Sequence, residues 1–418
     1  MTESSKEMGI VSSYSPAQFE RDMRYGTGGS LEIILKVTER CNIACTYCYF
    51  FFSADQSYKS HPTHLPEEVV EGLARFIRDG RRLYDLRRVR LILHGGEPLL
   101  LKRHRMIQLL EAVRDACVGI EFQPALQTNG MLVDDEWINV FHRFGVYVGV
   151  SVDGPKSIHD EFRVDKRGRG TYDRTLRGIH LLQQAYAQGK LPGSPGLLCV
   201  INPERSPREI YEHCIRELGF TNVDFLLPDS NHDSTTPEQS KKMAEFVAEI
   251  QRLYRRETDA RVRIRLIDSA VREINLPPVN ASLLARFLSQ KELVFTIASN
   301  GDIAPDDILR TTDPTIMTTG LNITSATLTD VLLSPVLGRL TDLSFSVPSD
   351  CMGCTWMNVC RGGHLYHRFS SANGFDNRSV YCEALQALYT GVSETFLLAG
   401  GDYRQLDDRI GRTLAPVV

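Results

Sequence analysis

Apolar and polar positions change their period in a regular order between residues 31 and 230. Short apolar runs rich in β-branched residues predict strands at 31–38, 89–95, 125–130, 146–154, 196–202 and 222–230. Segments whose apolar residues recur every three or four positions predict helices at 66–80, 103–117, 134–145, 171–190 and 206–219. Strands that alternate with helices imply parallel pairing and right-handed crossovers. The pattern therefore predicts an α/β fold, a partial (β/α)6 barrel whose chemistry lies at the carboxyl ends of its strands.

The pattern changes after residue 233. Helical periodicity continues through 237–257 and 266–274, and the segment 294–307 has the composition of a hairpin. The last hundred residues hold a second group of cysteines. We therefore expect an N-terminal extension at 1–30, a barrel with its following helices at 31–275, and a second domain at 276–418, with the junction within 276–292.

Composition narrows the class of protein. The chain has 418 residues, of which 42% are hydrophobic and 24% charged, and these values are typical of a globular enzyme. A net charge of -4 provides no basic field for gathering nucleic acid. The first thirty residues lack the apolar core of a secretory signal, and no later run approaches a membrane span. We expect a cytoplasmic protein with no nucleic-acid or membrane partner.

Seven of the ten cysteines fall into two groups, a tight triplet and a C-terminal set. Disulfide scaffolds are much shorter chains, so clustered thiols in a reducing compartment favour metal binding. The other three, Cys117, Cys199 and Cys214, lie in helix or strand patterns and are interpreted as small buried apolar residues.

The triplet Cys41, Cys45 and Cys48 follows the first predicted strand with the spacing CxxxCxxC. Three thiolates on one short loop can bind three irons of a [4Fe–4S] cluster and leave the fourth iron open. The alternative is zinc, but structural zinc sites have four closed ligands and normally paired CxxC units. The spacing favours the cluster.

This segment closely resembles the radical S-adenosylmethionine (SAM) superfamily, whose motif is CxxxCxΦC with an aromatic Φ, here Tyr47. The resemblance implies that SAM binds the open iron and is cleaved reductively to a 5′-deoxyadenosyl radical that removes a substrate hydrogen. HGGEP at the end of the second strand, QTNG at the third and SVDGP followed by HDEFR at the fourth resemble further superfamily segments. The residues that this assigns to SAM are Tyr47, Gly95, Gly96, Glu97, Pro98, Asn129, Ser151, Asp153 and Arg163.

Each of these assignments has a structural alternative. GGEP alone would mark only a turn. Arg163 is the sharper choice for a carboxylate because a guanidinium matches it bidentately, but it could instead be a surface arginine paired with a neighbour. Asn129 could simply adopt a turn conformation.

The C-terminal cysteines allow two interpretations. The spacing CxxC-x5-C-x3-H, from Cys351 to His364, suits a Cys₃His zinc site. The segment also resembles the SPASM extension of radical SAM peptide maturases, which holds two auxiliary clusters. That resemblance assigns one [4Fe–4S] cluster to Cys351, Cys354, Cys360 and Cys382, all present here. The ligands of the other cluster are missing, since His364 and Asp306 stand at two of its places. We therefore expect one auxiliary cluster.

Two acids are candidate proton acceptors. Asp307 stands where sulfatase-maturing relatives keep a catalytic acid, and Asp229, with Asp233 close by, follows the sixth strand at the barrel mouth. Exposed turn aspartates are common, so a purely structural role is the alternative. His364 and His367 could serve only to orient the C-terminal fold.

From about residue 31 to about 385 the chain looks most like maturases that install cyclophane cross-links in ribosomally made peptides. The resemblance implies a precursor peptide as substrate, a reductant such as flavodoxin or ferredoxin, and a C–C bond between a β-carbon and an aromatic ring. One alternative is a formylglycine-generating sulfatase maturase, although such relatives carry both auxiliary clusters. The other is a non-catalytic, zinc-stapled peptide-binding protein, which the complete triplet and GGEP argue against.

Overall fold

Parallel strands form the centre of the computed structural model, which describes residues 29–84, 86–275 and 293–410. Within these residues the sheet order is β10-β9-β8-β1-β2-β3-β4-β5-β6-β7, parallel from β8 to β7, with β9 and β10 antiparallel. The strands are β1 (Ser30–Thr38), β2 (Arg88–Gly95), β3 (Glu121–Thr128), β4 (Tyr147–Ser151), β5 (Gly196–Val200), β6 (Asn222–Leu226), β7 (Arg263–Ile264), β8 (Leu293–Ile297), β9 (Asp302–Ala304) and β10 (Leu321–Asn322).

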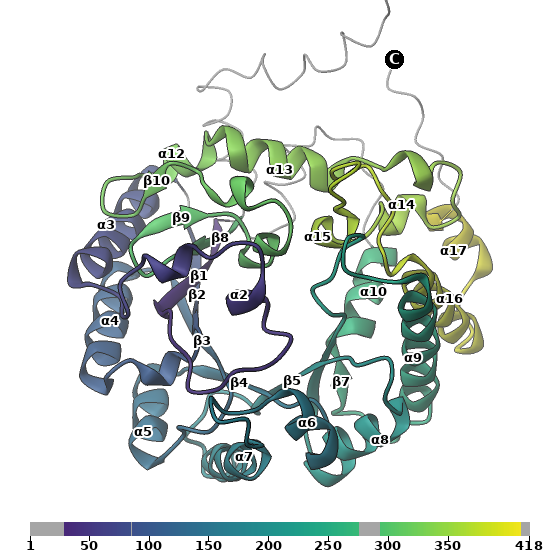
Figure 1. The fold of residues 1–418 in the computed structure, drawn as a ribbon, viewed down its shortest axis with the longest axis horizontal. Helices are drawn as coiled ribbons and strands as arrows, with labels where there is room; N and C mark the ends of the chain where they lie inside the picture. The colour runs from purple at the N-terminus through teal and green to yellow at the C-terminus, as the bar shows by residue number, and fades with distance from the viewer. Residues whose placement is uncertain (1–28, 85, 276–292, 411–418) are drawn as a thin grey trace, which may run out of the picture.

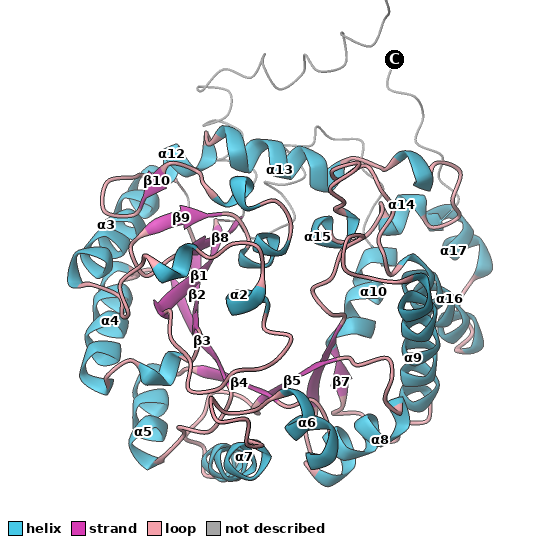
Figure 2. Cartoon of the chain, viewed as in Figure 1, coloured by secondary structure: helices cyan, strands magenta, loops and turns pink. Residues whose placement is uncertain are grey.

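Helices form an outer ring around the strands, while the short α2 lies inside it (Figures 1 and 2). Those of the barrel half are α2 (Tyr49–Phe52), α3 (Glu67–Leu83), α4 (Arg103–Ala116), α5 (Asp135–Phe144), α6 (Lys156–Phe162), α7 (Tyr172–Ala187), α8 (Pro207–Glu212), α9 (Pro237–Arg255) and α10 (Arg265–Asn275). Those that follow are α12 (Leu328–Leu332), α13 (Pro335–Phe345), α14 (Met357–Cys360), α15 (Leu365–Arg368), α16 (Cys382–Leu398) and α17 (Tyr403–Ile410).

The six predicted strands are confirmed as β1 to β6, and each is followed by a helix. Two details differ. The pattern at 206–219 is divided into α8 and a π-helical turn, His213–Glu217. The two-residue β7 was missed, because such a short strand carries no readable alternation.

The predicted hairpin at 294–307 is confirmed as β8 and β9. It does not stand apart from the barrel, since β8 pairs in parallel with β1 from Leu31↔Leu293 to Leu35↔Ile297. The C-terminal part therefore extends the barrel sheet, and it also packs α16 on α9, where Gln251 Nε2 donates to the Leu388 carbonyl at 2.6 Å. The expected junction at 276–292 and residues 1–28 of the expected N-terminal extension lie outside the described residues.

The core confirms the interpretation of the isolated cysteines. Cys117, Cys199 and Cys214 are all buried within the main hydrophobic core. Among the described residues, no helix has both the length and the apolar character that crossing a membrane requires.

Candidate active site at the barrel mouth

The cysteine triplet lies on the loop between β1 and α2, at the carboxyl end of the barrel sheet. Two backbone hydrogen bonds hold this loop against the segment after α6, from Ala44 N to the Val164 carbonyl (2.8 Å) and from Thr46 N to the Phe162 carbonyl (3.0 Å). The three thiols pack together with Ile43 and Met131. The expected ligands are thus gathered in one place.

Burial makes this loop costly for thiolates unless a cation is present. Desolvation raises the pKa of Cys41 to about 12. It raises the pKa of Cys45 to about 11 even though the nearby Arg163 charge lowers it. A cluster that needs three thiolates would supply the compensating positive charge through its irons, so the donor set fits a [4Fe–4S] cluster.

The glycines of the GGEP segment are explained by close packing on the cysteine loop. A Cβ on Gly95, whose φ is +145°, would lie 2.0 Å from the Thr38 carbonyl oxygen, and one on Gly96 would lie 2.3 Å from that of Arg40. Gly96 N donates to the Thr38 carbonyl at 3.0 Å, and Glu97 N to that of Arg40 at 2.9 Å. The sequence interpretation attributed these glycines to the approach of SAM, whereas the structure shows that the backbone of the β1 loop already requires them.

The Glu97 carboxylate joins the ends of β2 and β3. It accepts from Thr128 Oγ1 at 2.8 Å, Asn129 N at 2.9 Å and Leu99 N at 3.1 Å. Burial raises the pKa of Glu97 to about 7, although these hydrogen bonds lower it. Asn129 is more than a turn residue, because its Nδ2 donates to Asn42 on the cysteine loop at 2.8 Å.

Arg163 is buried and bidentate with Asp153, at 2.8 Å and 3.2 Å. It is therefore not a surface arginine, although it is paired with a neighbour, as the alternative interpretation expected. Its NH1 lies 3.9 Å from Cys45 Sγ, and Tyr47 donates to the same Asp153 carboxylate. Ser151 accepts from Gln127 Nε2 at 2.9 Å. The fourth-strand residues thus converge on the cysteine loop, and their contacts with SAM stay predictions.

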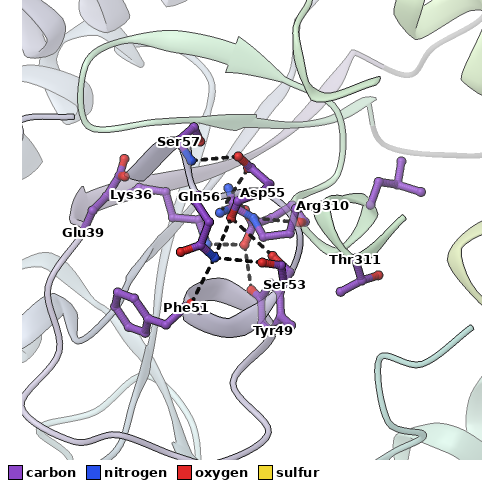
Figure 3. Close-up of polar contacts among 12 residues, drawn as sticks. Lys36, Glu39, Tyr49, Phe51, Ser53, Asp55, Gln56, Ser57, Arg310 and Thr311 are labelled. Carbon is purple, nitrogen blue, oxygen red and sulfur yellow. Dashed lines mark hydrogen bonds and ion pairs between the residues drawn. The ribbon is translucent and has the colours of Figure 1, made fainter. Parts of the chain in front are cut away.

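Asp307 is buried among charged and polar groups. Figure 3 shows three of its partners, Lys36, Tyr49 and Arg310. Its carboxylate is paired with Lys36 and with Arg310 at 3.0 Å, and it accepts from Tyr49 Oη at 2.7 Å. Burial alone raises the pKa of Asp307, but the Lys36 and Arg310 charges outweigh it and hold that pKa well below its usual range. The alternative of an exposed turn aspartate is wrong, since Asp307 is 2% exposed.

The buried charges extend across three elements. Lys36 on β1 also lies 3.0 Å from His94 Nδ1 on β2, and Arg310 lies 3.4 Å from Asp55, which follows α2. The sequence analysis missed Lys36 and Arg310. The available signal was one lysine in the otherwise apolar part of the first strand, where a buried charge requires a partner.

Asp229 has the opposite environment from Asp307. It lines a cavity of about 750 Å³ between the cysteine loop and the end of β6, together with Tyr47, Cys48, Tyr49 and Phe52. Burial and the neighbouring negative charges of Asp306 and Asp307 raise the pKa of Asp229 to about 7. A carboxylate with that pKa in a cavity can exchange a proton near neutral pH.

The other acid and the two histidines have structural contacts. Asp233 accepts from Ser371 N at 3.0 Å and from its hydroxyl. His367 is fully buried and its Nε2 lies 3.0 Å from the Pro228 carbonyl. His364 stacks on Tyr366 with ring centroids 5.5 Å apart. The Asp233 and His367 contacts attach the C-terminal part to the loop after β6, whereas the His364 contact lies within the C-terminal part.

The four C-terminal cysteines are brought to one place by loops and by the start of α16. Cys351 ends the 3-10 turn Ser349–Cys351, Cys354 N donates to the Cys351 carbonyl at 3.1 Å, and Cys382 begins α16. The thiol charges of Cys351 and Cys382 raise the pKa of Cys360, after the larger effect of burial, so these groups are electrostatic neighbours. Among the described residues, no three His, Cys, Asp or Glu side chains are close enough to hold a single metal ion.

Residues 35–197 match the model of the Radical SAM superfamily. This segment is about two fifths of the chain and contains the cysteine loop and the strands up to β4. The match supports an oxidoreductase that uses SAM and a [4Fe–4S] cluster. The predicted α/β barrel class is thereby confirmed.

Curated proteins with similar sequences include enzymes that mature sulfatases. The chain is 34% identical to the serine-type anaerobic sulfatase-maturating enzyme of Bacteroides thetaiotaomicron over 144 residues, 34% of each protein. It is 23% identical to the cysteine-type anaerobic sulfatase-maturating enzyme of Clostridium perfringens over 370 residues, 86% of this chain and 95% of that one. The stronger identity thus covers only about a third of the relative, and the longer match is weaker.

Two solved structures share the fold. The structure of native anSMEcpe with bound AdoMet and Cp18Cys peptide has a TM-score of 0.72 and 22% identity, and the match covers 88% of this chain and 98% of that one. Streptococcus suis SuiB bound to the precursor peptide SuiA has a TM-score of 0.58 and 17% identity, covering 88% and 78%. The likeness therefore includes the C-terminal part, which has the SPASM-like fold predicted from the sequence.

Proposed function

We propose that this radical SAM enzyme is a maturase of a ribosomally synthesised peptide and forms a cyclophane C–C cross-link. The observation that carries the proposal is the cavity at the barrel mouth, which combines the cysteine loop, an aromatic lining and the Asp229 carboxylate with its raised pKa. Tyr49, Phe52 and Phe369 line this cavity and offer stacking surfaces to an aromatic side chain of the peptide. Asp229 lines the same cavity.

A peptide substrate is supported by the relatives. The two curated relatives described above are sulfatase-maturating enzymes, and both solved structures contain a bound peptide. A cavity of about 750 Å³ accommodates a few side chains of such a peptide. The rest of the substrate would lie over the exposed rim.

Asp229 is the proposed proton acceptor. SAM bound at the cluster supplies the radical that removes a β-hydrogen, after which the aromatic ring gains a C–C bond and must lose one electron and one proton. The Asp229 carboxylate opens into the cavity and has room to take that proton, whereas each oxygen of Asp307 already has a cationic partner. Asp307 is then a positioning residue that holds Tyr49 and the α2 segment in place.

The four cysteines Cys351, Cys354, Cys360 and Cys382 are proposed to hold one auxiliary [4Fe–4S] cluster. Such a cluster would be the acceptor for the electron that leaves the ring. This ligand set, the SAM contacts of Tyr47, Gly95, Gly96, Glu97, Pro98, Asn129, Ser151, Asp153 and Arg163, and the division into domains at 1–30, 31–275 and 276–418 remain proposals.

The second candidate is oxidation of a sulfatase serine or cysteine to formylglycine. The 95% coverage of the cysteine-type sulfatase-maturating relative favours it. The sequence disfavours it, because Asp306 and His364 occupy positions at which the second auxiliary cluster would need thiolates.

The test uses the iron-loaded, reduced protein with SAM and the short peptides encoded beside its gene. A cyclophane product is lighter by two hydrogens per cross-link, since two C–H bonds are replaced by one C–C bond. Oxidation of serine to formylglycine removes two hydrogens as well, so mass alone does not separate the candidates. Fragmentation that leaves the linked residues joined, with no reaction toward a carbonyl label, supports the cyclophane, and a labelled aldehyde overturns it.

A further inference from the structure

A second cavity, of about 580 Å³, lies on the outer side of the cysteine loop and is strongly basic. Its lining residues are Asn42, Met131, Leu132, Asp165, Lys166, Arg167, Arg169, Arg174 and Arg177. We call it the basic cavity. Five cations against one carboxylate leave a surplus of four positive charges in a chain whose overall net charge is -4. Most of its charges lie on the loop between α6 and α7, at the lower edge of the ring in Figure 1, and on α7 itself.

Part of this charge is available to a partner. Asp165 is paired with Arg169 at 2.7 Å and with Arg174 at 3.2 Å. The side chains of Lys166, Arg167 and Arg177 are exposed, and no acidic group within the described ranges forms an ion pair with them. Three unpaired cations on one rim attract an acidic surface and accelerate its approach.

The basic cavity is attached directly to the cysteine loop. Asp165 forms an antiparallel bridge with Ile43, and Ala44 N donates to the Val164 carbonyl at 2.8 Å. The charged turn and the loop that bears the cysteines are therefore joined by backbone hydrogen bonds.

The wall of the basic cavity touches the cluster ligands. Asn42 Oδ1 lies 3.8 Å from Cys41 Sγ, and Met131 packs in one cluster with Cys41, Cys45 and Cys48. Both Asn42 and Met131 line the basic cavity, so a partner seated there would lie close to the cluster ligands.

We propose that the basic cavity is the docking surface of a small acidic electron-carrier protein, which delivers one electron to the cluster held by Cys41, Cys45 and Cys48. The carrier is oxidised by one electron and the cluster is reduced by one, with no bond made or broken. The inference rests on the radical SAM chemistry proposed above, which consumes one electron for each SAM cleaved. It requires a partner with its redox group close to an acidic face, as in flavodoxin.

The experiment compares two charge-reversal variants of the iron-loaded full chain. One carries Lys166→Glu, Arg167→Glu and Arg177→Glu in the basic cavity. The matched control carries Lys241→Glu, Arg256→Glu and Arg339→Glu, exposed cations on α9, at its end and on α13. Both change the net charge equally. The probe is purified oxidised flavodoxin, and binding is measured by titration calorimetry at about 50 mM and about 300 mM salt.

We expect the affinity of flavodoxin for the wild type to fall as the salt concentration rises. Flavodoxin should bind the cavity variant about tenfold more weakly than the wild type, and its affinity for the control variant should stay within about twofold of the wild-type value. Equal weakening in both variants would show a net-charge effect only and would overturn the proposal. Unchanged binding by the cavity variant would overturn it too. Weaker binding of an acidic substrate peptide, with flavodoxin unaffected, would reassign the basic cavity to the substrate.

A second readout separates docking from the chemistry. With dithionite, a small reductant that needs no docking surface, the cavity variant should cleave SAM at the wild-type rate, whereas with reduced flavodoxin its rate should fall about tenfold. Equal loss with both reductants would mean a damaged cluster loop and would contradict the proposal. Failure of wild type to cleave SAM with dithionite would instead remove the proposed function, whatever the binding result.

Discussion

At the residue scale, the two candidate acids differ because their surroundings differ. Asp229 has a pKa of about 7 and opens into the cavity, so it accepts a proton only when the pH is above about that value. We expect product formation to fall as the pH drops through about 7, and Asp229→Asn to lose about 100-fold in rate together with this pH dependence. Deoxyadenosine formation should persist, since SAM cleavage precedes the proton loss.

The matched control is Asp233→Asn. The Asp233 carboxylate also lines the cavity, but its oxygens accept hydrogen bonds from Ser371, so this variant should retain about half or more of the wild-type rate. The stability of the folded protein provides a second check, because Asp229→Asn is expected to slow the reaction without destabilising the fold. Because the pKa of Asp229 is raised from its ordinary 3.8 to about 7 in the folded protein, stability falls as the pH rises between these two values, and the whole cost is present above about 7. Asp229→Asn removes this cost, so it should not lower the melting temperature at pH 8. A slow variant that melts earlier at that pH would indicate damage to the fold.

A second prediction at the residue scale concerns Gly96. A Cβ there would lie 2.3 Å from the Arg40 carbonyl oxygen, so Gly96→Ala must displace the cysteine loop. We expect SAM cleavage to fall about 100-fold, as a misplacement of about 1 Å can produce. The control is Gly338→Ala on α13, where the added methyl group meets no atom within 4 Å. Iron content and deoxyadenosine yield distinguish a lost cluster from a misplaced one.

At the element scale, the buried charges join β1, α2 and the 3-10 turn Asp307–Thr311. Asp307→Leu leaves Lys36 buried without its partner and should lower the free energy of unfolding by about 3–5 kcal/mol. The double variant Lys36→Met with Asp307→Leu removes both charges and should recover much of that loss. Urea unfolding measures both, and a double variant as unstable as the single one would show that packing, not charge, is responsible.

The position of Cys382 at the start of α16 leads to a prediction about the auxiliary cluster. Because Cys382 is brought there beside the loop of Cys351, Cys354 and Cys360, wild type should hold about eight irons per chain. Cys382→Ala should approach about four, while Cys214→Ala, a buried core thiol, should keep about eight. A Cys₃His zinc site would instead give about four irons and one zinc, with the zinc lost in His364→Ala. Metal and sulfide analysis of these variants decides between them.

At the scale of the whole molecule, barrel and C-terminal part share one sheet. Pairing with β8 covers the β1 edge, and α16 covers α9. A chain that stops after Asn275 would expose this edge and the apolar face of α9, so we expect little soluble protein and no cooperative melting. A soluble, cooperatively melting product would show that the expected boundary near residue 275 separates independent domains.

Much of this molecule is determined by the sequence alone. Alternation of apolar residues predicted the six barrel strands and their helices, because strand and helix periods are properties of neighbouring residues. The cysteine loop was equally readable, since Cys41, Cys45 and Cys48 lie within eight positions of one another and a loop holds them together in any fold.

Other features were decided only by the tertiary structure, because they depend on residues far apart in the chain. Lys36 and Asp307 are 271 positions apart, and nothing in either segment shows that their charges meet. Their pairing occupies Asp307, whereas Asp229 lines the cavity, and the sequence, which offers both acids as candidates, does not show this difference. The same holds for β8 at the β1 edge and for the basic cavity on the cysteine loop. In each case packing, rather than local pattern, sets the distance between groups and therefore their chemistry.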